Sequence, residues 1–185
     1  MAELSPVLAT WKILEHDILG NLVAEKNLNN LVVNTGREML LRSLFMVGAS
    51  SGVVAMGVGA STTTATVTDI ALTYELTGNG ARKPLTNVNS AALSTADIIS
   101  ETVVINSVTY YRKLVCQAVW QTTDGNNNNV FGEYGLYSSI GVPFIPAVPL
   151  TPSASVGVMF NHLIDPSPTL KTSSNSITSQ VTIRF

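Results

Sequence analysis

The sequence is poor in charge. Only 12% of its 185 residues are charged, which is about half the usual share for a soluble domain. The net charge is −2, so the chain lacks the basic surplus of a nucleic-acid-binding domain and we expect no nucleic-acid partner. Because the chain is so poor in charge, we expect protein partners to cover much of its surface.

Cysteine and long apolar runs are also scarce. Cys116 is the single cysteine, which excludes an intrachain disulfide framework and a multi-cysteine zinc site. The N-terminus lacks a basic region followed by an apolar run, so we expect no signal peptide. No stretch of about 18 uninterrupted apolar residues exists, so we also expect no membrane span.

Alternation of apolar and polar residues is abundant, and it predicts about eight β-strands. These lie at 11–17, 22–26, 31–33, 53–59, 108–121, 130–137, 156–162 and 177–185. The first two predict a hairpin. The polar loop 124–129 predicts a second, long hairpin from 108–121 and 130–137. Residues 82–84 are expected on the surface, and 165–168 are expected to turn the chain.

Residues 36–46 carry the strongest helix signal. Thr35 and Glu38 have the spacing of a capping box. An apolar stripe follows at Leu40, Leu41, Leu44 and Phe45. A helix of about three turns cannot bury such a stripe alone, so we expect it to lie on a sheet. The fold prediction is mainly β: a single antiparallel β-sandwich or jelly-roll-like domain over 1–185, with the helix closing one end.

Prolines recur every third residue between 142 and 152. Polyproline II has three residues per turn, so these prolines would line one edge of an arm of roughly 30 Å. Two interpretations stay open: a stiff loop on its own domain, or an arm docked on a neighbouring subunit. With an N-terminal arm at 1–8, this segment supplies the predicted subunit-interface residues. They are Pro6, Pro143, Phe144, Ile145, Pro146, Val148, Pro149, Leu150 and Pro152.

Reactive groups do not form a recognisable catalytic set. Ser50 lies in a G-x-S-x-G sequence, but the predicted helix precedes it, whereas a nucleophile elbow needs a strand before and a helix after the serine. His16 and His162 are the two histidines, and both are interpreted as hydrogen-bonded strand residues. Asp165 is close to His162 in sequence, but a predicted strand end separates them. Cys116 is interpreted as a small core residue.

Binding motifs are equally weak. Gly57-Val58-Gly59 lacks the third glycine of a dinucleotide site and the Gly-Lys of a P-loop. Glu133 lies within a strand, where a buried carboxylate needs partners. It is interpreted as a structural acid that holds a loop or pairs with an arginine, with metal binding as the alternative. The aromatics of 110–137 suit a core better than a sugar-binding platform. We therefore predict no enzymatic activity, no cofactor and no metal.

Three places in the chain resemble a family of small structural proteins of tailed bacteriophage virions. The first is Asn30-Leu31-Val32-Val33-Asn34-Thr35-Gly36 at the entry to the helix. The second is Met56-Gly57-Val58-Gly59, with Thr68-Asp69-Ile70-Ala71-Leu72 after a Ser/Thr-rich loop. The third joins Glu133-Tyr134-Gly135-Leu136-Tyr137 to the closing segments 170–177 and 181–185. Together they span most of the chain in the order found in that family.

This resemblance implies a non-enzymatic β-sandwich of the virion, assembled in the cytoplasm of a host bacterium. Its partners would be other virion proteins, either the major capsid protein or tail and baseplate proteins, and other copies of itself. A capsid decoration (cement) protein that bridges capsid subunits is the first expectation, because the chain combines low charge, an apolar proline arm and an N-terminal arm with the lack of a catalytic set. A tail, baseplate or fibre component that contacts the host surface is the alternative.

Overall fold

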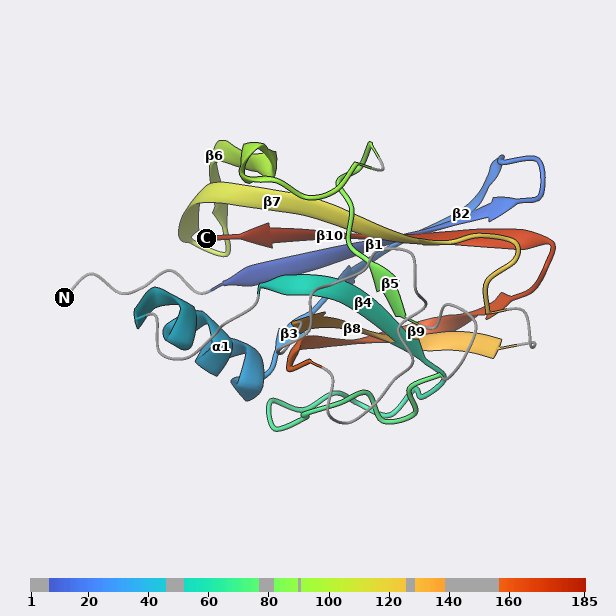
Figure 1. Ribbon diagram of the computed structural model, residues 1–185, viewed down its shortest axis with the longest axis horizontal. Coiled ribbons are helices and arrows are strands. Elements are labelled where there is room, and N and C mark those ends of the chain that lie inside the picture. The colour runs from blue at the N-terminus through green and yellow to red at the C-terminus, as the bar shows by residue number, and fades with distance from the viewer. Residues whose placement is uncertain (1–6, 46–51, 77–81, 90, 126–128, 139–156) are drawn as a thin grey trace.

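The fold consists of two antiparallel sheets packed face to face (Figure 1). The computed structural model describes residues 7–45, 52–76, 82–89, 91–125, 129–138 and 157–185. Sheet A has the order β2 (Leu22–Asn29), β1 (Leu8–Asp17), β10 (Asn175–Arg184), β7 (Val108–Trp120) and β6 (Ile98–Ile105). Sheet B has the order β3 (Leu31–Val32), β9 (Met159–Lys171), β8 (Asn129–Ser138), β4 (Val53–Gly59) and β5 (Arg82–Pro84). The predicted β-sandwich is confirmed, while the jelly-roll arrangement stays a prediction.

The core lies between the two sheets and is built from the inward members of each alternating strand. Trp11 of β1, Trp120 of β7, and Phe131 and Tyr134 of β8 form its aromatic centre. The ring centroids of Trp120 and Phe131 are 5.6 Å apart and those of Trp11 and Tyr134 are 5.8 Å apart. Tilted and edge-to-face pairs at such distances are favoured between aromatic rings. Of the aromatics predicted for the core, Tyr110, Trp120, Tyr134 and Tyr137 are buried, whereas Tyr111 is 57% exposed, so the prediction is wrong for Tyr111.

Helix α1 (Asn34–Phe45) follows β3 and packs against β9. The predicted capping box is wrong, because the helix already begins at Asn34 and the Thr35 hydroxyl donates to the Met159 carbonyl, 2.7 Å away. A Cβ on Gly36 would meet the backbone of Phe160, so this glycine allows helix and strand to touch. Met39 joins the core. The helix therefore lies on a sheet, as expected.

Three other local predictions are corrected. β7 and β8 do not form a hairpin, because β7 lies in sheet A and β8 in sheet B, so their connection crosses between the sheets. Residues 165–168 do not turn the chain, since β9 runs through them opposite an irregularity in β8. Arg82 is buried within β5 and is not on the surface.

The predicted arms fall largely outside the described residues. Leu8 already belongs to β1, so an N-terminal arm extends at most to residue 7. The arm at 142–152 lies wholly outside. So do all the predicted interface residues: Pro6, Pro143, Phe144, Ile145, Pro146, Val148, Pro149, Leu150 and Pro152. Ser50 of the G-x-S-x-G sequence lies outside as well.

Candidate functional site

The outer face of sheet B is covered by the chain that follows β4. This covering segment, residues 60–76, returns over the sheet, and its Leu76 amide donates to the Val58 carbonyl at 3.0 Å. Gly59 makes room for it, because a Cβ there would lie 2.5 Å from the Tyr74 carbonyl. The Gly57-Val58-Gly59 sequence thus allows two stretches of chain to approach closely, and the structure gives it no cradle for a phosphate.

Glu133 of β8 is the main anchor of the covering segment. Its side chain is fully buried, and its two oxygens accept from the backbone amides of Thr73 and Tyr74 at 2.9 and 2.6 Å. Oε2, the oxygen that accepts from Thr73, also lies 2.9 Å from Nε2 of His162. Burial raises the pKa of the Glu133 carboxyl, but the hydrogen bonds from His162, Tyr74 and Thr73 hold it below its ordinary value. The predicted role as a structural acid that holds a loop is confirmed.

His162 of β9 links two carboxylates. Its Nε2 faces Glu133, and its Nδ1 lies 2.7 Å from Oδ2 of Asp69 in the covering segment. A neutral imidazole has one donor nitrogen, whereas the imidazolium donates from both, so this geometry favours the charged form. Burial lowers the pKa of His162, but the bonds to Glu133 and Asp69 outweigh it, and the pKa is raised above its ordinary value of 6.5.

A second ionic group holds the far end of the same segment. Arg82 of β5 donates through Nε to one Glu75 oxygen at 2.5 Å and through Nη2 to the other at 2.9 Å. Its guanidinium also lies 3.7 Å from the ring centroid of Tyr137, a cation–π contact. The Tyr137 hydroxyl accepts from the Leu72 amide at 3.3 Å. Two charged groups therefore attach residues 69–76 to sheet B.

A separate buried ion pair joins the two sheets. Lys26 of β2 contacts Oδ2 of Asp165 at 2.7 Å and Oγ1 of Thr169 at 2.9 Å, and it also donates to the Ser167 carbonyl. The Asp165 side chain is fully buried. Asp165 therefore pairs with a lysine of the other sheet and not with His162, so the sequence neighbours His162 and Asp165 do not form part of a triad.

These buried groups are suited to holding the fold together. Each charged side chain of the Glu133 and Arg82 groups already contacts an opposite charge or a backbone amide within the chain. Among the described residues, no group of three or more His, Cys, Asp or Glu is arranged to hold a metal ion. Burial raises the pKa of the Cys116 thiol to about 12, which keeps it in the unreactive protonated form.

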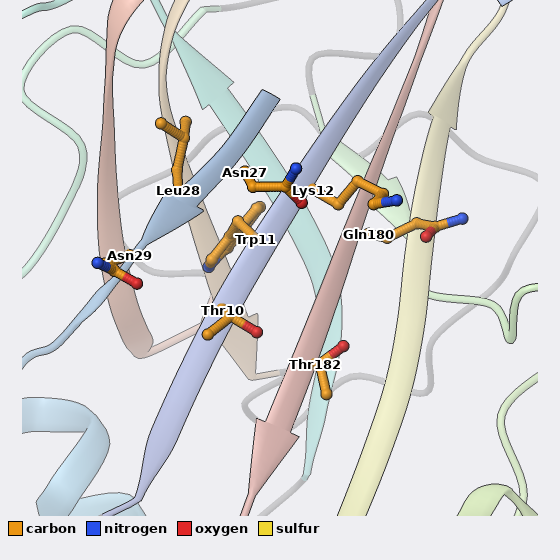
Figure 2. Close-up of a pocket in the computed structure, with 8 residues that line it drawn as sticks. All are labelled: Thr10, Trp11, Lys12, Asn27, Leu28, Asn29, Gln180 and Thr182. Carbon is orange, nitrogen blue, oxygen red and sulfur yellow. The ribbon is translucent and has the colours of Figure 1, made fainter. Parts of the chain in front are cut away.

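The outer face of sheet A offers a different kind of site. A shallow depression of about 240 Å³ lies across β2, β1 and β10, and Figure 2 shows its lining side chains. The strand register places two polar rows side by side: Asn29, Thr10 and Thr182 in one, and Asn27, Lys12 and Gln180 in the other. Ligand pockets for small molecules usually measure about 300–1,000 Å³. The depression is therefore better suited to contact with an extended polar surface.

Large apolar side chains gather at the tip of the β1–β2 hairpin. Ile18, Leu19, Leu22 and Val23 are each more than half exposed there. The turn between them is held by Asp17, whose Oδ1 accepts from the amides of Leu19 and Asn21 at 2.9 and 2.8 Å. A fixed turn loses little conformational freedom when its apolar side chains bind a partner.

Comparisons with protein-family models, curated proteins and solved structures gave no match for the chain. Within the described residues, no helix has the length and apolar character required to cross a membrane.

Proposed function

We propose that this chain is a non-enzymatic structural protein of a tailed-phage virion, in the first place a capsid decoration protein that bridges capsid subunits. The observation that carries the proposal is the contrast between interior and surface. The buried charged side chains of Glu133, His162 and Asp165 are used to hold segments of the chain together. Large apolar side chains, in contrast, lie exposed on the hairpin tip.

This contrast fits a protein that acts by binding to the surfaces of other proteins. Protein interfaces gain most of their affinity from a few desolvated apolar anchors. The exposed fractions of Ile18 and Leu19, 68% and 83%, leave both side chains available as anchors. The arms at 1–7 and 142–152 belong to the proposal as further contacts, on the strength of their apolar and proline-rich sequence.

Binding to capsids tests the proposal. Purified chain is added to capsids that lack it, and bound copies and the temperature of capsid opening are measured. We expect saturable binding and a higher opening temperature. Leu19→Ser should weaken binding, whereas Val88→Ser, which changes an exposed residue on another loop, should leave it unchanged. A folded chain that ignores capsids contradicts the proposal.

One observation favours the alternative, a tail, baseplate or fibre component that contacts the host surface. The depression on sheet A is lined by hydroxyl and amide side chains of Thr10, Asn27, Asn29, Gln180 and Thr182, which suit the hydroxyl groups of a surface glycan. The indole of Trp11 is buried in the core and offers no stacking surface there. Binding of the chain to cells of the host that is weakened by Gln180→Ala would favour this alternative, and labelling on the capsid shell would contradict it.

A further inference from the structure

The edge strand β6 has exposed apolar side chains and backbone groups that are complementary to those of a second β6. In the part of the chain that the structure describes, β6 pairs with β7 on one side and no strand lies on its other side. Figure 1 shows it at the margin of sheet A. Ile98, Ile99 and Val104 on this strand are 53%, 46% and 64% exposed. The Ile98 amide donates to the Thr95 carbonyl, so the row of backbone groups open to a partner begins after it. Such a row beside β-branched apolar side chains is a template for pairing with another strand.

The other edges of the two sheets are protected in ways that β6 is not. β3 has 2 residues, and β5 has 3 residues and contains Pro84. β2 is as long as β6, but it carries Glu25 and Lys26. Short strands, proline, charged residues and bulges are the usual means of preventing strand addition. β6 has a bulge and a single ionisable residue, Glu101, which is paired with Lys113 and Arg184, each at 2.8 Å. Glu25 and Lys26 of β2 are likewise paired, with Lys12 and Asp165.

The register irregularity in β6 determines which of its residues share a backbone orientation. Ser100 pairs with Arg112 and Val103 with Tyr110, so three steps along β6 match two along β7. Because of this bulge, Ser100 and Val103 have the same backbone orientation although they are three positions apart. Residues 98, 100, 103 and 105 share one backbone orientation, and residues 99 and 104 share the other, because their β7 partners alternate without a break.

We propose that β6 pairs antiparallel with β6 of a second copy of this chain, across a two-fold axis at the bulge between Glu101 and Thr102. In this register Ile99 lies opposite Val104 of the second copy, and Ser100 lies opposite Val103. Opposed residues then have matching backbone orientation, as an antiparallel ladder requires. Because the axis maps each side onto the other, every apolar pair forms twice. The two five-stranded sheets A would become one continuous sheet.

This pairing is independent of the proposed function, because a chain that never enters a particle would still dimerise. Its test is sedimentation equilibrium of the purified chain over a range of concentrations. Val104→Lys places a charge opposite Ile99 on both sides of the axis, and we expect it to weaken dimerisation by about tenfold or more. Leu170→Lys is the matched control, since Leu170 is 51% exposed on β9 of the other sheet, and it should dimerise like the unaltered chain.

The register has a sharper test. Combining Ile99→Glu with Val104→Lys places opposite charges across each of the two pairs, and dimerisation should recover to within about threefold of the unaltered chain. An unaltered chain that stays monomeric at about 1 mM overturns the proposal. So does a dimer that Val104→Lys leaves intact, or a double variant that remains as weak as Val104→Lys alone. Capsid binding by a strictly monomeric chain would overturn the pairing while supporting the proposed function.

Discussion

Replacing His162 with glutamine removes the cation between two carboxylates. The imidazole side chain is fully buried, as is that of Glu133, and the Asp69 side chain is 23% exposed. A neutral amide cannot balance both charges, so Glu133 would be left buried without its cationic partner. The fold should survive, because the aromatic core between the sheets lies on the opposite face of sheet B.

The cost can be estimated from the burial of this group. Removing one member of a buried ion pair typically costs about 3–5 kcal/mol, much of it from the charge left behind. The partial exposure of Asp69 places the expected loss for His162→Gln at the lower end, about 3 kcal/mol. A loss of 1 kcal/mol lowers Tm by about 2–4 °C in a domain of this size, so Tm should fall by about 6–12 °C.

The pH dependence of stability gives a second readout with a definite sign. The pKa of His162 is raised above 6.5 by Glu133 and Asp69. The folded state therefore binds the proton more tightly than the unfolded chain. This stabilisation is fully present below pH 6.5 and is lost as pH rises through the folded pKa. The pKa values of Glu133 and Asp69 are lowered, so their contribution is present above their ordinary pKa values and is lost in acid.

The assay is thermal unfolding followed by circular dichroism between about pH 5 and 9. The unaltered chain should lose stability from pH 6.5 upward, whereas His162→Gln should be less stable and should lack that decline. His16→Gln is the control, because it removes the other histidine, which lies on β1, and it should keep the decline. A His162→Gln variant with unchanged Tm and unchanged pH dependence would refute the reasoning.

Two further predictions concern packing and the inter-sheet ion pair. Lys26→Met leaves the buried carboxylate of Asp165 without its cation, and we expect the free energy of unfolding in urea to fall by about 2 kcal/mol, less than for a fully buried pair because Lys26 is partly exposed. Lys12→Met, in a solvent-exposed pair, should change this free energy little. Equal effects of the two substitutions would contradict the buried Lys26–Asp165 pair. Gly59→Ala introduces a Cβ where the covering segment already lies, and the free energy of unfolding should fall by about 1–3 kcal/mol. Gly52→Ala, with open space around it, should leave it unchanged. Urea unfolding of both variants measures the difference.

The sequence by itself determined much of the local structure. Alternation identified the β1–β2 hairpin and the strands β7 and β10, since side chains of a strand point alternately to its two faces. The sequence also identified one helix near residues 36–46, and it identified Glu133 as an acid that holds a loop. The strand and helix predictions succeeded because each depends on neighbours within a few residues. The prediction for Glu133 followed from the partners that a buried carboxylate requires, although the amides it binds are 60 and 59 positions away.

Only the tertiary structure decided which segments meet. Alternation fixes the face of a strand but not its partner, which is why β7 and β8 were predicted as a hairpin and lie in different sheets. The charged groups show the same limit: His162 and Asp69 are 93 positions apart, and Lys26 and Asp165 are 139 apart. A single sequence gives no local signal for such pairs, because their attraction arises only after the two sheets have buried them together.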